Sequence, residues 1–363
     1  MELHELSIRE VSGLIGSKEI SPVEITQIML DRIEEHDERL NTYITVAADL
    51  ALETAKKAEK EISMGNYIGP LHGVPIGLKD IFVMKDIRST AGSSILENFI
   101  SPYNSTVTQK LIDSGAVILG KNNMDGFAMG SSNETSYYGV VRNPWDTDRV
   151  PGGSSGGSAA ATAASLCYGS VGTDTGGSIR QPAALCGIVG MKPTYGRASR
   201  FGMIAFASSL DQAGPLTKSV YDAALILKTI SGHEKRDSTS VDSPVPDYTS
   251  NLKEDFKGFK IGIPKEYFTD GIDTEVENAV KDAIKLITDL GAELVEISLP
   301  HTEYASATYY IIAPSEASSN LARFDGVRYG FRAENSDDLI DMYKKTKTQG
   351  FGKEVKRRIM IGT

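Results

Sequence analysis

Apolar residues near the start of the chain recur at the spacing of an amphipathic helix. In "SPVEITQIMLDRIEEH", Ile25, Met29 and Ile33 lie four residues apart, and side chains at this spacing share one helix face. Ser21 is a good N-cap, and Pro22 suits the first turn. We therefore expect a helix that begins after Ser21 and buries one apolar stripe.

A period of two replaces this pattern in "HGVPIGLKDIF". Val74, Ile76 and Leu78 alternate there with glycine and proline, which predicts a short strand. Lys79 and Asp80 follow directly. We expect the strand to present both side chains at its end.

Helical and strand patterns then alternate along the chain. Residues 105–119 read as a helix, a stop at glycine and a strand, and residues 273–299 repeat this order with Gly291 as the stop. Residues 259–264 supply a further strand. Such alternation favours an α/β fold with a mixed or mostly parallel sheet and helices on its faces. The polar residues 231–253 are interpreted as a surface excursion within one domain.

Composition narrows the class of protein. The 363 residues are 40% hydrophobic and 24% charged, enough for a sizeable core, and the net charge of -10 argues against a broad nucleic-acid-binding face. Cys167 and Cys186 lack CxxC spacing and are interpreted as buried thiols. The start "MELHELS" is not typical of a signal peptide, and no apolar run approaches the length of a membrane span. We expect a cytoplasmic protein with no membrane contact.

Two glycine–serine motifs stand close together, "PGGSSGGS" at residues 151–158 and "GTDTGGSIRQP" at residues 172–182. By composition the first could be a flexible linker. However, it runs directly into residues 158–166, a small-residue segment suited to a buried helix. A phosphate loop is disfavoured because the chain lacks GxxxxGK[ST], and no GxGxxG follows a clear strand here.

The second motif indicates acyl-transfer chemistry. Consecutive amides of Thr175, Gly176, Gly177 and Ser178 could converge on an oxyanion, and Ser178 could be the attacking hydroxyl. Glycine suits this loop because a Cβ would block the approach of a carbonyl group.

A serine nucleophile also needs a base. Among the five histidines the nearest candidate is His72, which lacks an obvious acidic partner, so a Ser–His–Asp arrangement is weakly supported. Lysine is the alternative if burial keeps its amine uncharged. Lys79, at the end of an apolar strand, suits that demand.

Together, "GGSSGGSAAATAASLCYGSVGTDTGGSIRQPAA" and "GVPIGLKD" resemble the amidase signature family. The resemblance implies a single large mixed β-sheet covered by helices on both faces. It implies Ser178 as nucleophile, Ser154 as a bridging serine in a cis peptide and Lys79 as terminal base. The amides of residues 175–178 would hold the oxyanion.

Flanking segments such as "NNMDGFAMGSSNETSYYGVVRNPWD" and "GFGKEVKRRIMIGT" resemble the A-subunit family of bacterial glutamyl-tRNA(Gln) amidotransferases. That family hydrolyses glutamine and passes ammonia to a B subunit. The B subunit uses ATP and Mg²⁺ to amidate Glu-tRNA(Gln), and a small C subunit braces the pair. The resemblance implies no metal or cofactor in this chain and tRNA contact mainly through B.

The same resemblance implies three substrate contacts. Arg358 would pair with the α-carboxylate of glutamine, Tyr309 would contact the substrate, and Ser131 would line the pocket. From sequence alone, Arg358 also fits a solvated basic run, Tyr309 fits simple packing against its neighbours, and Ser131 fits an ordinary turn. Two departures are Gly126, where an acidic residue is expected, and the end at Thr363. We expect residues 1–363 to form one domain that is incomplete at its C-terminal end.

Two other functions share these motifs. A stand-alone amidase would use the same triad on another small amide, and a non-catalytic scaffold would keep the fold and bind partners only.

Overall fold

The computed structural model describes residues 2–252 and 255–363, whose contacts form two compact units. The larger unit joins Met1–Tyr248 to Ile312–Thr363, and the smaller unit is Thr249–Ile311. Residue 253, which ends the predicted surface excursion, and residue 254 lie outside the described residues. That residues 1–363 form one domain stays a prediction, because grouping by contacts does not test which parts fold alone.

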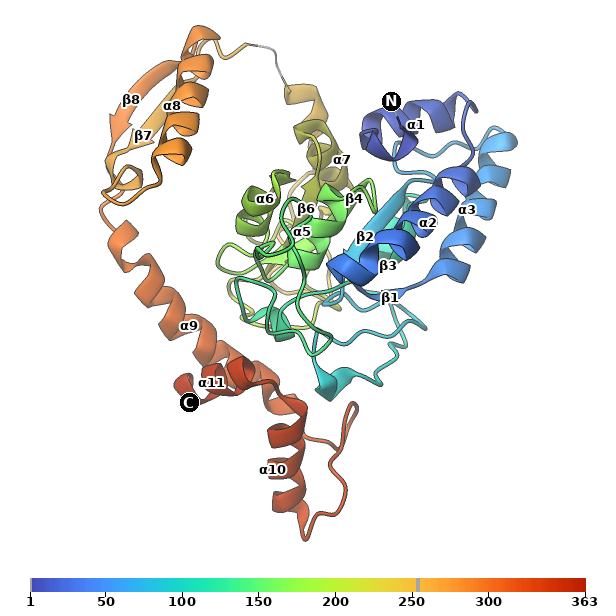
Figure 1. Cartoon of the computed structure of the whole chain (residues 1–363), viewed down its shortest axis with the longest axis vertical. Helices are drawn as coiled ribbons and strands as arrows, with labels where there is room; N and C mark the ends of the chain where they lie inside the picture. The colour runs from blue at the N-terminus through green and yellow to red at the C-terminus, as the bar shows by residue number, and fades with distance from the viewer. Residues whose placement is uncertain (1, 253–254) are drawn as a thin grey trace. The chain divides into compact units, whose positions relative to one another are not determined.

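A six-stranded mixed sheet forms the centre of the larger unit (Figure 1). Across the sheet the strands are β1 (Tyr43–Val46), β3 (Val117–Asn122), β2 (Pro75–Lys79), β4 (Gly169–Asp174), β6 (Gln212–Thr217) and β5 (Val189–Gly190). Strand β2 is parallel to β3 and β4, whereas the β1–β3, β4–β6 and β5–β6 pairs are antiparallel. Every residue of β2, β3, β4 and β6 is buried.

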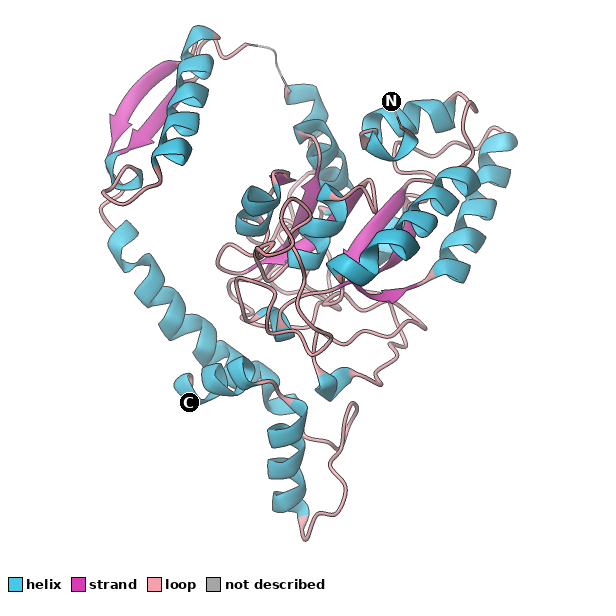
Figure 2. Ribbon diagram, in the orientation of Figure 1, coloured by secondary structure: helices cyan, strands magenta, loops and turns pink. Residues whose placement is uncertain are grey.

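Helices pack around this sheet (Figure 2). Those before residue 248 are α1 (Ile8–Gly16), α2 (Pro22–Leu40), α3 (Ala48–Ser63), α4 (Thr106–Asp113), α5 (Gly156–Ala163), α6 (Arg180–Cys186) and α7 (Val220–Ile230). The predictions of a cap at Ser21 and a strand ending at Lys79 are confirmed. The predicted small-residue helix begins at Gly156, two residues early.

The two faces of the sheet are covered by different helices. On one face Ser170 of β4 donates a 2.9 Å hydrogen bond to the carbonyl of Ser158 in α5. On the other face a Cβ added at Gly169 would lie 3.1 Å from Ile226 of α7 and from Ile8 of α1. Successive residues of a strand point to opposite faces. The predicted α/β fold, a mixed sheet covered by helices on both faces, is therefore confirmed.

The smaller unit contains a separate two-stranded sheet. Strands β7 (Lys260–Pro264) and β8 (Glu293–Ile297) are parallel and joined by α8 (Thr274–Asp289). Gly291 follows the helix with φ at +104°, as expected for the predicted stop. Both strands were expected, but they pair with each other and not with the six-stranded sheet. A parallel pair joined by a helical crossover makes such a unit.

The remaining helices are α9 (Ala305–Asn320), α10 (Leu339–Gly350) and α11 (Lys353–Ile361). Helix α9 starts in the smaller unit and ends in the larger one. Within the described ranges, no helix combines the length and apolar character that crossing a membrane requires.

Candidate active site

Lys79 ends strand β2 with a fully buried side chain, and its amine contacts three hydroxyl groups. Its Nζ lies 2.8 Å from Oγ of Ser154, 2.8 Å from Oγ of Ser155 and 2.9 Å from Oγ1 of Thr173. The two serines precede α5, and Thr173 belongs to β4, which adjoins β2. Strand order and the start of α5 thus bring the two motifs together at one amine.

Burial is the main influence on the charge of this amine. It lowers the pKa of Lys79 to about 7, while the carboxylates of Asp125, Asp174 and Asp211 oppose the fall. A large fraction of the amine is therefore neutral at neutral pH, and a general base must be unprotonated to act.

The hydroxyl partners are compatible with that neutral state. Ser155 donates its proton to the carbonyl of Thr173 over 3.1 Å, so it accepts from Lys79. A neutral amine has two N–H donors and one lone pair. With Ser155 and Thr173 accepting, the lone pair can accept the proton of Ser154.

Three neighbouring segments hold Ser154 in place. The Gly153–Ser154 peptide is cis, as the resemblance implies. The amide of Gly153 donates to Oε1 of Gln181 over 2.9 Å, and the amide of Asp125 donates to the carbonyl of Ser154 over 3.3 Å. Gln181 also donates through Nε2 to the carbonyl of Ser131, 2.9 Å away. The predicted pocket residue Ser131 therefore lies in a loop tied to the serine motif.

Ser178 contacts the serine motif through its backbone carbonyl. Its side chain is 8% exposed, and its carbonyl accepts from the amide of Ser155 over 3.2 Å. Within the described part of the chain, no hydrogen bond joins its hydroxyl to Ser154. The structure thus contains the predicted Lys79–Ser154 contact, while the contact between the two serines stays a prediction.

One of the four amides expected to hold an oxyanion is already engaged. The amide of Gly177 donates to Oδ1 of Asp174 over 2.8 Å, and the amide of Ile179 donates to Oδ2 over 3.2 Å. The amide of Gly177 is thus bound to Asp174 in this structure, and its part in holding an oxyanion stays a prediction. Asp174, at the end of β4, therefore accepts from amides of the turn that leads into α6. Unpaired amides at the start of a helix favour an anion. The amides of Thr175, Gly176 and Ser178 have no such acceptor among the described residues.

Arg180 holds the same carboxylate. Its Nε and one terminal nitrogen each lie 3.0 Å from an oxygen of Asp174. Burial alone would raise the pKa of Asp174, but the bonds and charge of Arg180, together with the loop amides, outweigh burial and lower it. Asp174 is thereby kept ionised beside the candidate nucleophile.

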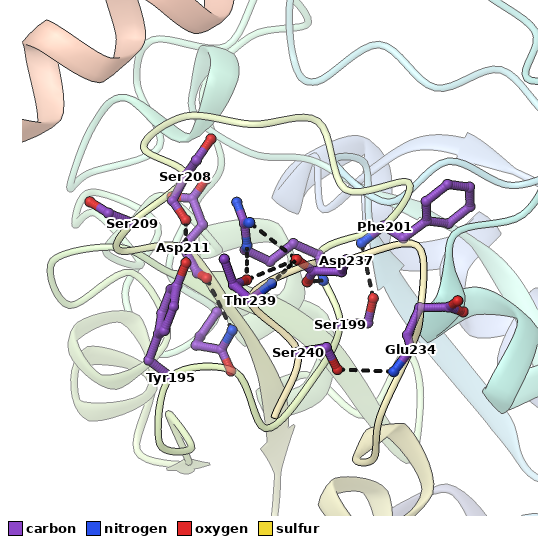
Figure 3. Close-up of polar contacts among 12 residues, drawn as sticks. Tyr195, Ser199, Phe201, Ser208, Ser209, Asp211, Glu234, Asp237, Thr239 and Ser240 are labelled. Carbon is purple, nitrogen blue, oxygen red and sulfur yellow. Dashed lines mark hydrogen bonds and ion pairs between the residues drawn. The ribbon is translucent and has the colours of Figure 1, made fainter. Parts of the chain in front are cut away.

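A second buried carboxylate fixes Thr175. Asp211 accepts from Oγ1 of Thr175 over 2.6 Å and from the amide of Phe206 over 2.9 Å. Burial raises the pKa of Asp211 to about 6. Figure 3 shows Asp211 beside Ser208 and Tyr195, and the hydroxyl of Tyr195 donates to the carbonyl of Ser208 over 2.6 Å. The loop that bears the oxyanion amides is therefore held from both of its ends.

The predicted substrate contacts differ in how the structure places them. Arg358 is buried in α11, 2.8 Å from Glu354 and over the ring of Phe206, so it lies against the segment that holds Asp211. Tyr309 is half-buried in the smaller unit, with its ring 5.2 Å from that of Tyr310. Contacts of Arg358, Tyr309 and Ser131 with a substrate stay predictions.

Gly126, where the resemblance predicts an acidic residue, lies in the turn beside Asp125. A Cβ added there would meet the carbonyl of Thr135 at 3.4 Å and Val355 at 3.6 Å, ordinary contact distances. Space alone therefore does not require glycine at this position.

The weaker Ser–His–Asp alternative gains no support at His72. Its ring is buried, with Nε2 3.2 Å from Glu61 and Nδ1 accepting from the amide of Ile68. These contacts describe a structural histidine. Among the described residues, no three histidine, cysteine or acidic side chains are grouped so as to hold a metal ion.

Sequence reasoning missed several residues of the site. They are Ser155, Thr173, Asp125, Asp174, Arg180, Gln181 and Asp211. All except Asp211 lie within the motifs or flanking segments quoted above, so the sequence placed them in the same segments as the candidate site. Their contacts were not visible in the sequence, because they depend on strand order and loop geometry.

Comparison with known proteins agrees with this geometry. The profile of the amidase family matches residues 24–363, and the chain belongs to that family.

Comparison with individual proteins of known sequence or structure gives closer similarities than the family profile. The chain is 59% identical to the glutamyl-tRNA(Gln) amidotransferase A subunit of Geobacter sp. (strain M21), over all of this chain and 75% of that protein. The crystal structure of the A subunit from Thermotoga maritima is 40% identical over 100% of this chain and 71% of its own, with a TM-score of 0.79. The peptide amidase of Stenotrophomonas maltophilia is 32% identical over 98% and 75%, with a TM-score of 0.86.

Proposed function

We propose that this chain acts as the A subunit of a glutamyl-tRNA(Gln) amidotransferase and hydrolyses glutamine to supply ammonia. The observation that carries the proposal is the buried amine of Lys79, 2.8 Å from Ser154, in a chain 59% identical to a relative of that name.

The proposed reaction begins with attack of Ser178 Oγ on the side-chain amide carbon of glutamine. Its proton passes to Ser154, whose own proton passes to Lys79. Amides of Thr175, Gly176 and Ser178 stabilise the resulting oxyanion. Lys79 then returns a proton through Ser154 to the leaving nitrogen, so that ammonia departs and a glutamyl ester remains on Ser178. Water, deprotonated by the same route, cleaves the ester to glutamate.

Substrate recognition in this proposal uses Arg358, Tyr309 and Ser131. Arg358 would exchange its contact with Glu354 for the α-carboxylate of glutamine, for which a planar guanidinium is suited. Tyr309 and Ser131 would contact the rest of the substrate.

Partner subunits complete the proposed pathway. The B subunit would use ATP and Mg²⁺ to activate Glu-tRNA(Gln) and add the ammonia, and the C subunit would brace the pair. The net charge of -10 is consistent with tRNA contact mainly through B. The proposal requires no cofactor in this chain, and its location would be the cytoplasm.

The decisive experiment assembles the chain with B and C subunits and measures glutamate release and amidation of Glu-tRNA(Gln). An electrophilic glutamine analogue should add to Ser178, as shown by mass spectrometry, and Ser178→Ala should abolish both activities. Adduct formation at another residue, or none in folded protein, would contradict the proposal.

A stand-alone amidase is the second candidate. The peptide amidase of Stenotrophomonas maltophilia shares this fold with a TM-score of 0.86, so the same fold can serve that activity. Turnover of unrelated amides with no response to glutamine or to partner subunits would select this alternative.

A further inference from the structure

Asp125 is a fully buried carboxylate that follows β3 and faces the serine motif. Its oxygens accept from the amide of Asn133 over 3.0 Å, from the amide of Thr135 over 3.1 Å and from Oγ1 of Thr135 over 2.7 Å. Burial raises the pKa of Asp125, while these donors and the charge of Lys79 act in the opposite direction and favour the ionised form. Asp125 therefore carries a negative charge into the interior beside the candidate relay.

The backbone around Ser154 is closely fitted to this carboxylate. A Cβ added at Gly153 would lie 2.2 Å from Oδ2 of Asp125, and one added at Gly130 would lie 2.3 Å from its Cγ. The amide of Asp125 donates to the carbonyl of Ser154 over 3.3 Å. Asp125 is thus part of the surface against which the Gly153–Ser154 turn packs.

Three carboxylates act on the amine of Lys79, and they differ in what else they bind. Asp174 is held by Arg180 at 3.0 Å, and Asp211 also experiences the charge of Arg200. Asp125 experiences the charge of Lys79 itself. Asp125 comes first among the three carboxylates in its effect on Lys79.

We propose that Asp125 is a positioning residue for the proton relay, one that supports the turn bearing Ser154 and supplies the counter-charge for the ammonium that forms on Lys79. The ammonium arises on a fully buried side chain, where an unpaired charge is costly. A fixed carboxylate lowers that cost each time Ser154 passes a proton to the amine. This role rests on the proposed function of Lys79 as base.

The test measures acylation of Ser178 by a fluorophosphonate, which needs the relay but not glutamine recognition. Serine attacks phosphorus and fluoride leaves, so intact mass gives the rate at each pH. If the wild-type protein reacts at Ser178 but does not hydrolyse glutamine with its partners, the substrate assignment fails while this inference is still tested.

In Asp125→Asn we expect the acidic limb of the rate profile to shift to lower pH by about one unit. Loss of the opposite charge makes the Lys79 ammonium harder to form, which lowers the pKa of Lys79. We also expect the plateau rate to fall by about tenfold or more. Asp242→Asn, which removes an exposed carboxylate, should match wild type. A folded Asp125→Asn protein with an unshifted limb would overturn the proposal.

A second pair of variants covers the case in which Asp125→Asn does not fold. Thr135→Val removes the 2.7 Å hydroxyl bond to Asp125 and keeps the carboxylate, whereas Thr135→Ser keeps both. Thr135→Val should shift the acidic limb or lower the plateau, and Thr135→Ser should restore wild-type behaviour. Identical profiles for the two variants would contradict a role of Asp125 in the relay.

Discussion

Lys79 and Ser154 are joined by a 2.8 Å hydrogen bond between Nζ and Oγ, and both side chains are completely buried. The pair links the end of a central strand to the start of α5. This contact places a partly neutral amine where it can take the proton of a serine, and several predictions depend on it.

Replacing Lys79 by methionine should abolish acylation of Ser178. Loss of the base is expected to lower the rate by about a thousandfold or more, since the serine relay then has no proton acceptor. Fluorophosphonate labelling followed by mass spectrometry measures this. The exposed Lys85→Met is the matched control, and circular dichroism checks folding. Normal labelling of folded Lys79→Met would mean that another base operates.

Acylation should depend on pH with a midpoint near the Lys79 pKa of about 7. The base must be neutral, so the rate rises through this pH and falls about tenfold per unit well below it. The profile is read from labelling rates between pH 5 and 9. A rate that is flat across this range would contradict the assignment of Lys79.

The same lowered pKa predicts a stability effect. Between pH 7 and the usual lysine range near 10.5 the unfolded chain binds more protons at this site, so wild-type stability gains from rising pH. Lys79→Met lacks this group and the gain. Urea unfolding at pH 7 and pH 9.5 measures this effect. The free energy of unfolding of wild type, relative to that of Lys79→Met, should be larger at pH 9.5 than at pH 7. An unchanged difference would argue that the amine is not buried.

Gly153→Ala should destabilise the protein and stop acylation. Its Cβ would lie 2.2 Å from Asp125 and 2.8 Å from the amide of Ser132, and overpacking of this kind costs about 1–3 kcal/mol or more. Thermal unfolding measures the loss. Gly13→Ala is the control, because nothing lies within 4 Å of the added atom inside α1, and it should stabilise by about 0.5–1 kcal/mol. Equal behaviour of the two variants would contradict the packing described for Gly153.

Arg180→Ala should loosen the loop that bears the oxyanion amides. Asp174 would lose two 3.0 Å bonds, and small displacements of catalytic groups can cost about a hundredfold in rate. Arg180→Lys should recover only part of the rate because it keeps the charge but not the two-pronged geometry. Arg149→Ala, in an exposed ion pair with Asp146, is the control. Full activity of Arg180→Ala would show that the loop holds its shape without the Arg180–Asp174 contact.

The pattern of the chain predicted local features well. The cap at Ser21, the strand ending at Lys79 and the stop at Gly291 follow from neighbouring residues. The buried helix after "PGGSSGGS" was predicted from small residues, with its start two positions late. Such features depend on spacing and turn geometry, which the sequence carries directly.

The contacts within the site could not be predicted in this way. Lys79 contacts Ser155 and Thr173, which lie 76 and 94 residues away in the sequence. These contacts form because β2 lies between β3 and β4 in the sheet. The engagement of Gly177 by Asp174 was missed because the same loop residues can present their amides inward or outward.

The sequence by itself therefore determined local features such as the cap at Ser21, the strand ending at Lys79 and the stop at Gly291, together with the candidate serines and lysine, because each follows from residues close together in the chain. Only the tertiary structure decided which hydroxyls surround the amine, which carboxylates act on it and how far burial lowers its pKa. Exclusion of water and the distances between charges set those properties, and both exist only after distant segments have packed together.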